Sequence, residues 1–152
     1  LVTSTIERLR RLYMGLRPGM LEDLGLTATI EWQTEDFARR SDIDCHLVRL
    51  DQVVVHDVER SLALYRAFQE ALDNVLRHSG ATRVQVSLIL RGHEVVLRVA
   101  DDGRGVTDER KEFSEPLGLA AVRERLRSCG GQLLVRPAEP RGTVFEATVR
   151  IT

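Results

Sequence analysis

Two pairs of alternating segments, each joined by a short turn, restrict most strongly how this chain can fold. Residues 82–92 (TRVQVSLILRG) and 93–103 (HEVVLRVADDG) place apolar side chains at every second position, and residues 132–139 and 143–152 form a second such pair. A period of two is typical of strands that bury one face. Because such short turns leave no room for a helical crossover, we predict two antiparallel hairpins.

Helical periodicity accounts for most of the remaining chain. We predict helices over residues 3–16, from about Thr27 to Arg40, from about Val55 to Ser79 with Gly80 as its cap, and over the segment PLGLAAVRERLRSCGG. A strand over residues 43–50 separates the second helix from the third. Hairpins with helices gathered on one face predict a two-layer α+β sandwich with a mixed, largely antiparallel sheet. A fully parallel, doubly wound sheet is disfavoured by the hairpins.

Composition narrows the class of protein. The chain has 152 residues, of which 43% are hydrophobic and 30% charged, as expected for one soluble domain with a substantial core. Its 22 basic and 23 acidic residues form no long run of one sign, which argues against direct nucleic-acid binding and against a membrane-surface helix. Two isolated cysteines favour a reducing, cytoplasmic location. The chain begins with Leu1, so we expect it to be part of a longer protein.

The segment QEALDNVLRHSGA, in the third helix, carries Glu70, Asn74 and His78 at four-residue steps along one face. Beside that face runs an apolar stripe predicted to be buried: Phe68, Leu72, Val75 and Leu76. The amide oxygen of Asn74 suits Mg²⁺, Glu70 could orient or deprotonate a nucleophile, and Arg77 or His78 could meet phosphate charge. The alternative is an ordinary solvent-exposed face.

The glycine-containing segment DDGRG follows the second strand of the first hairpin. Asp101 ends that strand, where its carboxylate could accept a hydrogen bond from an exocyclic amine such as that of adenine. Gly103 and Gly105 let the backbone approach a flat ligand closely. Taken alone, a solvent-exposed turn would explain the same residues.

Two further glycines introduce the last helix and the last strand. Gly118 lies at the start of the helix, where unpaired amides attract anions, and Leu119, Val122 and Leu126 are predicted to pack that helix on the sheet. Gly142 and Thr143 begin the last strand, where a small residue and a hydroxyl could approach a ligand at Asp101.

Taken together, EALDN, DDGRG, GLAAVRER and RGTVF resemble the N box, the DxGxG box, the second glycine box and the terminal GT element of one family. This family is the ATP-binding catalytic domain of bacterial sensor histidine kinases, in the GHKL superfamily. The segment LRPGMLEDLGLTATIEWQTEDFARR looks like the linker of those kinases whose response regulators carry helix-turn-helix output domains. The resemblance therefore covers nearly the whole chain.

The resemblance implies a Bergerat-type sandwich that binds ATP and Mg²⁺. Adenine is expected at Asp101, Mg²⁺ at Asn74 and the phosphates near Arg77 and His78, while Glu70 polarises the imidazole of the acceptor histidine. Five further residues complete the expected nucleotide site: Gly103, Gly105, Gly118, Leu119 and Thr143.

The resemblance also implies partners. We expect residues 1–26 to be the end of a dimerisation helix and its linker, and residues 27–152 to be the catalytic domain. The γ-phosphoryl group would pass to a histidine on the dimerisation domain of a homodimeric kinase, and then to a response regulator with a helix-turn-helix output domain. None of the four histidines lies in a phosphoacceptor context, so this chain alone should bind ATP without autophosphorylating. Whether the parent protein is anchored in a membrane stays open.

Three alternatives share the same nucleotide motifs. A GHKL ATPase of the chaperone or topoisomerase kind would couple ATP hydrolysis to a conformational cycle. A serine kinase of the anti-sigma type would phosphorylate a partner protein, giving an acid-stable product. A nucleotide-binding module without turnover would use the same fold for contacts only.

Overall fold

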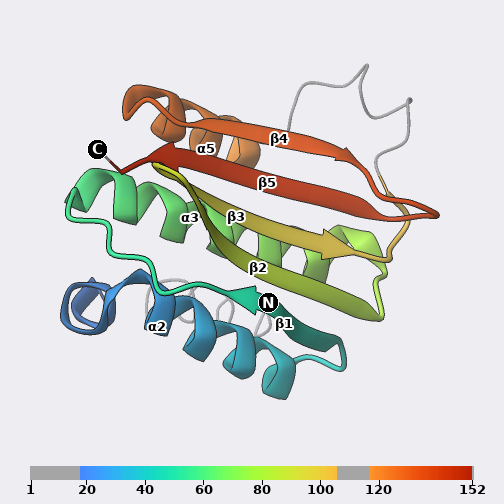
Figure 1. Cartoon of the computed structure of the whole chain (residues 1–152). Helices are drawn as coiled ribbons and strands as arrows, with labels where there is room; N and C mark the ends of the chain where they lie inside the picture. Colours follow the sequence, from blue (N-terminus) through green and yellow to red (C-terminus); the bar gives the residue numbers. More distant parts are fainter. Residues whose placement is uncertain (1–17, 106–116, 152) are drawn as a thin grey trace, which may run out of the picture.

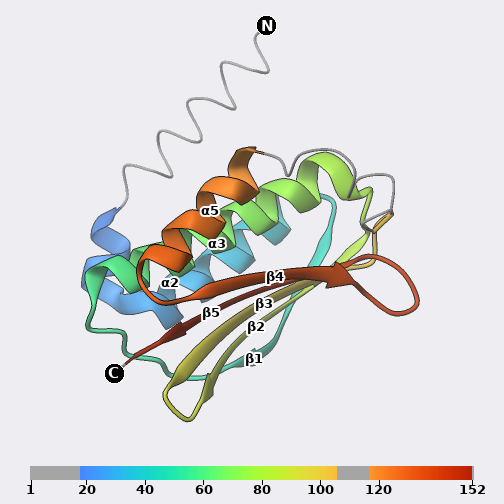
Figure 2. The ribbon, with the colours of Figure 1, turned by 90° about the horizontal axis from the view of Figure 1, so that it is seen from above.

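The computed structural model describes residues 18–105 and 117–151, apart from the side chains of residues 18, 19, 78, 79 and 117. One sheet is covered on one face by a layer of helices (Figures 1 and 2). The helical elements are α2 (Pro18–Arg40), α3 (Val58–Asn74), the π-helical turn η1 (Val75–Ser79) and α5 (Leu117–Ser128). The strands are β1 (Asp44–Leu50), β2 (Arg83–Arg91), β3 (Glu94–Asp101), β4 (Gln132–Pro137) and β5 (Thr143–Arg150).

The five strands are ordered β1-β2-β3-β5-β4. Strand β1 runs parallel to β2, and α3 provides the crossover between them, whereas the other three pairs are antiparallel. The hairpins β2–β3 and β4–β5 are those that the alternating segments predict. The predicted α+β sandwich with a mixed, largely antiparallel sheet is therefore confirmed.

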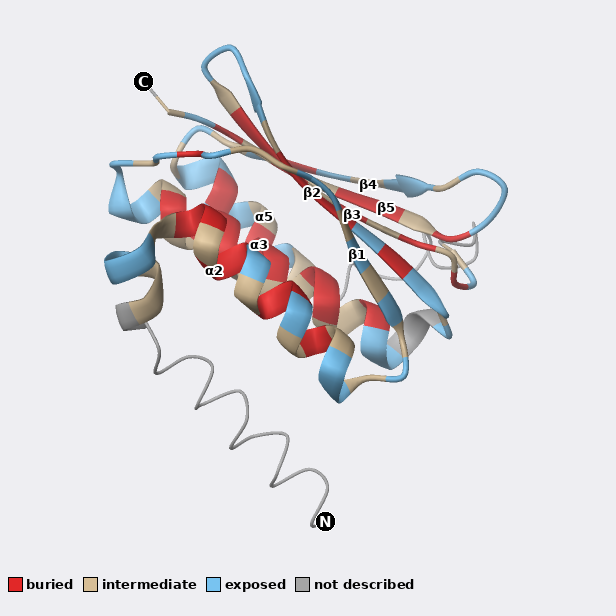
Figure 3. Cartoon of the chain, turned by 60° about the horizontal axis from the view of Figure 1, so that its bottom comes forward, coloured by how far each residue is buried: buried red, intermediate tan, exposed pale blue. Residues whose placement is uncertain are grey.

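The core lies between the sheet and the helices. Alternate residues of the central strands face the helices and are buried: Val84, Val86, Leu88, Val95, Leu97, Val99, Phe145, Ala147 and Val149. Figure 3 shows buried residues on the helix surfaces that meet the sheet. In α5, Val122 and Leu126 are buried and Leu119 packs against the core, as predicted.

Helix α3 positions much of the predicted chemistry. The Asp57 carboxylate caps its start by accepting a hydrogen bond from the amide of Arg60 at 3.0 Å, and Gly80 follows η1 in the predicted left-handed conformation (φ 62°). Burial of Leu76 was predicted and is wrong, because this residue is 58% exposed. Leu76 lies in the π-helical turn, which interrupts the regular α-helical spacing after α3, while the adjacent Val75 stays buried.

Helix α2 begins earlier than predicted. Its first residue is Pro18, and a fixed φ and a missing N–H are tolerated at the start of a helix. The predicted start near Thr27 instead follows a break at Gly25 (φ 83°). The Thr27 hydroxyl donates to the carbonyl of Asp51 at 3.0 Å and thereby ties α2 to the chain after β1.

The helix predicted over residues 3–16 lies outside the described residues. Among the helices that the structure does describe, none is both long and apolar enough to span a bilayer.

Candidate functional site

The Asp101 carboxylate lies at the end of β3, where the segment DDGRG (residues 101–105), called the glycine loop below, begins. This residue is 9% exposed, its Oδ1 atom accepts a hydrogen bond from the amide of Gly103 at 2.8 Å, and Thr143 is its cross-strand neighbour on β5. Burial raises the pKa of Asp101, although backbone hydrogen bonds from Gly103 and Thr143 oppose that shift. A partly desolvated acceptor with a fixed direction is suited to a ligand that donates a hydrogen bond.

The β4–β5 turn packs backbone to backbone against this loop. Gly142 has φ 103°, and a Cβ atom there would lie 1.8 Å from the carbonyl oxygen of Asp101. Gly105 has φ 79°, and a Cβ atom there would lie 2.8 Å from the carbonyl oxygen of Gly142. The Arg141 guanidinium adds a hydrogen bond from Nε to the carbonyl oxygen of Gly103 at 3.1 Å. These glycines are therefore required by close packing of the backbone around Asp101.

Asp102 has a different role from that of its neighbour. Its carboxylate accepts hydrogen bonds from the amide and the hydroxyl of Thr82, both at 2.8 Å, and from the amide of Arg83 at 2.9 Å. These hydrogen bonds lower the pKa of Asp102, and the largest contribution comes from the amide of Arg83. Asp102 thus fastens the start of β2 to the glycine loop.

Of the predicted residues on α3 and η1, Glu70 lies directly against α5. A Cβ atom at Gly118 would lie 2.0 Å from Oε1 of Glu70, so the first turn of α5 packs directly on that carboxylate. Asn74 is the last residue of α3 and is half-buried. Arg77 pairs with Asp73, with 3.1 Å between Nε and Oδ1. The side chain of His78 lies outside the described residues.

The structure therefore brings six of the predicted site residues together in two groups. Asp101, Gly103, Gly105 and Thr143 form one group, and Glu70 and Gly118 form the other. Leu119 is half-buried and packs against the core. The guanidinium of Arg104, in the glycine loop, reaches the residue that follows η1, because its Nε atom would lie 3.5 Å from a Cβ atom at Gly80. In Figure 1 the end of η1, the glycine loop and the β4–β5 turn lie at the same end of the molecule.

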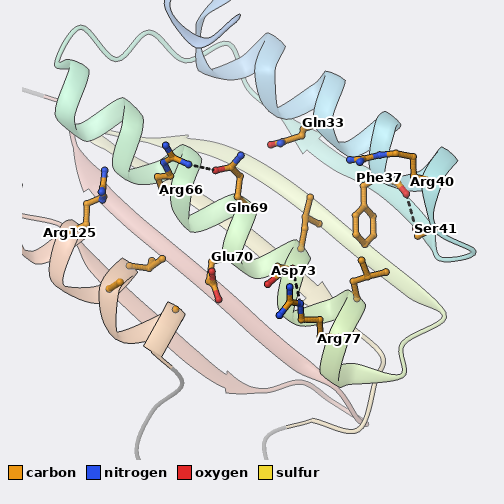
Figure 4. Close-up of a pocket in the computed structure, with 15 residues that line it drawn as sticks. Gln33, Phe37, Arg40, Ser41, Arg66, Gln69, Glu70, Asp73, Arg77 and Arg125 are labelled. Carbon is orange, nitrogen blue, oxygen red and sulfur yellow. Dashed lines mark hydrogen bonds and ion pairs between the residues drawn. The ribbon is translucent and has the colours of Figure 1, made fainter. Parts of the chain in front are cut away.

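A groove of about 490 Å³ crosses the outer surface of the helix layer, between α2, α3 and α5 (Figure 4). Glu70, Arg77 and Gly118 line this groove, whereas Asn74 and Asp101 do not. The groove therefore shares Glu70, Arg77 and Gly118 with the predicted site, but neither Asn74 nor Asp101.

Sequence reasoning did not identify the other polar residues of the groove. Arg66 and Arg125 face it, and among the described residues neither pairs with a carboxylate. Gln33, only 3% exposed, donates from Nε2 to the Tyr65 hydroxyl at 3.4 Å, while its Oε1 atom is buried without a partner in the described part of the chain. Helical periodicity marks Gln33 and Arg66 only as positions on separate helices, so no local signal brings them together.

Comparisons with known proteins support the motif assignment. Residues 59–152 match the family model described as histidine kinase-, DNA gyrase B- and HSP90-like ATPase. Two curated relatives are the sensor histidine kinase MctS of Rhizobium johnstonii, 35% identical over 96% of this chain, and the sensor histidine kinase NarS of Mycobacterium tuberculosis, 37% identical over 92%. The chain spans 32% and 33% of the lengths of these relatives.

A solved structure gives the same result for the fold. The mycobacterial sensor histidine kinase MprB superposes with a TM-score of 0.63 at 30% sequence identity, covering 82% of this chain and 93% of that chain. The family model covers more than half of the residues and includes all four motifs. The chain therefore belongs to the histidine kinase-, DNA gyrase B- and HSP90-like ATPase family, and it is homologous to the ATPase domains of sensor histidine kinases.

Proposed function

We propose that this domain binds ATP with Mg²⁺ and donates the γ-phosphoryl group to a histidine on the dimerisation domain of a sensor histidine kinase. The observation that carries the proposal is the buried Asp101 carboxylate at the end of β3, held by the amide of Gly103 inside a cradle of glycine backbone. Membership of the ATPase family supports a nucleotide as the ligand of that carboxylate.

Adenine would donate its exocyclic amine to Asp101. Gly103 and Gly105 have no side chain that could intervene between backbone and base, and Thr143, opposite Asp101, would contribute its hydroxyl. Leu119, half-buried beside the core, would offer apolar surface next to the bound nucleotide. A partly desolvated acceptor and glycine backbone fit a flat, hydrogen-bonding base.

The phosphates would extend from the base toward α3 and the start of α5. Asn74 supplies one amide oxygen, and within residues 18–105 and 117–151 no three His, Cys, Asp or Glu side chains gather as metal ligands. This donor set fits Mg²⁺, which takes most of its ligands from phosphate oxygens and water. Arg77 and His78 would balance phosphate charge, and the amides at Gly118 would add hydrogen-bond donors.

Glu70 would polarise the acceptor imidazole. Its carboxylate lies one turn before Asn74 on α3, so both side chains can serve one reaction centre. Phosphoryl transfer depends mainly on positioning and charge neutralisation, which these residues would supply without a covalent intermediate on this domain.

The remaining partners belong to the same proposal. Residues 1–26 would be the end of the dimerisation helix and the linker, and residues 27–152 the catalytic domain. The intact kinase would be a homodimer with its catalytic domain in the cytoplasm, and it would pass the phosphoryl group to a response regulator with a helix-turn-helix output domain. The likeness of residues 16–40 to such linkers supports this partner class.

Calorimetric titration of ADP, with and without Mg²⁺, tests the nucleotide site. Asp101→Asn should lower ADP affinity by about tenfold or more, because it removes the charged acceptor. Asn74→Ala should remove the gain in affinity that Mg²⁺ gives to the wild type. Asp42→Asn, at an exposed carboxylate, is the control and should bind ADP like the wild type. Wild-type affinity in Asp101→Asn, with its fold intact, would refute the adenine assignment.

The phosphorylated product of the full-length protein tests the acceptor. Phosphohistidine is labile in acid, whereas phosphoserine is stable, so radiolabelled product should disappear on acid treatment. An acid-stable product would instead favour the serine kinase, and steady ATP hydrolysis without labelled protein would favour the conformational ATPase.

A further inference from the structure

Gly103 connects Asp101 to Arg141, the first residue of the RGTVF segment, to which no role has been given above. The amide of Gly103 donates to Oδ1 of Asp101 at 2.8 Å, and its carbonyl oxygen accepts from Nε of Arg141 at 3.1 Å. Both polar backbone groups of Gly103 are therefore engaged, one by the predicted base-reading carboxylate and the other by the guanidinium of Arg141. Because glycine has no side chain to restrict its backbone, these two hydrogen bonds set the orientation of its peptide groups.

Arg141 is itself held in a fixed position relative to β3. It lies in the β4–β5 turn, where the amide of Ala138 donates to the carbonyl oxygen of Gly142 at 3.0 Å. Gly142 packs so closely on the backbone of Asp101 that a Cβ atom would not fit between them. The turn thus offers a firm base from which Arg141 reaches the glycine loop.

We propose that Arg141 is a positioning residue for base selectivity, which acts through Gly103 to aim the Asp101 carboxylate at the exocyclic amine of adenine. The inference rests on the proposed nucleotide site. Without the hydrogen bond from Arg141, the peptide group between Gly103 and Arg104 can rotate, which loosens the position of the Gly103 amide. The carboxylate then keeps its backbone hydrogen bond from Thr143 but is aimed less firmly. Arg141 has no contact with the base in this scheme.

Inosine diphosphate (IDP), whose base is hypoxanthine, tests the direction in which the carboxylate points. It carries a carbonyl oxygen where adenine carries the amine, so a correctly aimed Asp101 attracts ADP and repels IDP. The two nucleotides have identical sugars and phosphates. A change in overall charge near the phosphates therefore alters both affinities equally, and only a change at the base alters their ratio.

The experiment measures the dissociation constants of ADP and IDP, each with Mg²⁺, for the wild type and for Arg141→Met. The wild type should prefer ADP on the order of tenfold or more, since IDP leaves a buried acceptor facing another acceptor. Loss of one hydrogen bond should reduce the preference in Arg141→Met by about three- to tenfold. Arg141→Lys, which keeps a donor and the charge, should restore part of the preference.

Arg136→Met is the matched control, because Arg136 is an exposed arginine of the same hairpin. It should leave the preference for ADP unchanged. An unchanged preference in Arg141→Met, an equal loss of ADP and IDP affinity, or the same fall in Arg136→Met would overturn the role of Arg141. A wild type that binds no ADP would overturn the nucleotide site as well, so the two failures can be told apart.

Discussion

The glycine-loop end and the groove on the helix layer are built in different ways. At the loop end, backbone packs on backbone, and the close contacts involve Asp101, Gly105 and Gly142. In the groove, side chains from α2, α3 and α5 meet across a cavity of about 490 Å³. Close backbone contacts permit only glycine at a given position, whereas a wide groove tolerates many side chains. The first region is therefore readable in the sequence from its glycines, whereas in the groove only part of the lining, such as Glu70 and Gly118, belongs to a motif.

The largest effect should come from adding one methyl group at the loop end. Gly142→Ala would place a Cβ atom 1.8 Å from the Asp101 carbonyl oxygen at a left-handed φ, and we expect a loss of about 3 kcal/mol or more in the free energy of unfolding. Urea denaturation measures this loss.

Gly130→Ala separates steric contact from backbone strain. Gly130 has φ 78°, but a Cβ atom there has no neighbour within 4 Å. This control should lose only about 1–2 kcal/mol, the value for left-handed backbone alone. Equal losses in the two variants would contradict the importance of close packing at Gly142.

Within the groove, truncation of two leucines one turn apart should have unequal effects on the free energy of unfolding. Leu72 is 6% exposed and Leu76 is 58% exposed. Leu72→Ala should lower the free energy of unfolding by about 2–5 kcal/mol because it opens a cavity. Leu76→Ala should change it by less than about 0.5 kcal/mol. Urea denaturation of both variants checks the difference, and a large loss in Leu76→Ala would mean that this face is covered in solution.

Gly118 lines the groove but, like Gly142, has a neighbour too close to leave room for a Cβ atom, so its substitution sharpens the comparison. A methyl group there meets the mobile end of the Glu70 side chain, not a backbone atom, and alanine favours the helix. We expect Gly118→Ala to change stability by less than about 1 kcal/mol, while the displaced Glu70 lowers phosphoryl transfer in the full-length kinase.

A double variant tests whether Gly118→Ala lowers phosphoryl transfer by displacing Glu70. If Gly118→Ala acts by moving Glu70, it should have no further effect on phosphoryl transfer in a Glu70→Gln background. An additional loss in the double variant would show that Gly118 acts independently, for example on the phosphates.

The smallest predicted effect concerns the pH dependence of stability. Burial raises the pKa of Asp101 above that of the unfolded chain, so its ionised form disfavours the folded state. Asp101→Asn should therefore be more stable than the wild type at neutral pH, and this advantage should disappear as the pH falls through the folded-state pKa. Thermal unfolding at a series of pH values measures the trend, and a constant difference would contradict it.

The sequence predicted the fold well because its signals are local. Alternating residues and short turns identify the β2–β3 and β4–β5 hairpins, and a single glycine marks the end of η1. Leu76 was wrongly predicted because uniform α-helical spacing cannot anticipate the π-helical turn. The start of α2 was misjudged because proline both ends and begins helices.

For the candidate site, motifs identified residue types but not their contacts. The packing of Gly118 on Glu70, the hydrogen bond from Arg141 to Gly103 and the burial of Gln33 all join segments far apart in the chain. Such contacts depend on how the layers pack, which no local pattern records. The roles of Glu70, Asn74 and Asp101 in phosphoryl transfer remain predictions for the experiments above.

The two adjacent carboxylates of the DDGRG segment give the loop an unusual acid response. Burial raises the pKa of Asp101, whereas hydrogen bonds lower that of Asp102. Acidification therefore relieves an unfavourable charge at the floor of the site while it weakens the attachment of the loop to β2. These two contributions to the pH dependence of stability have opposite signs and partly cancel in the whole domain. Substitution of either aspartate will therefore expose the contribution of the other.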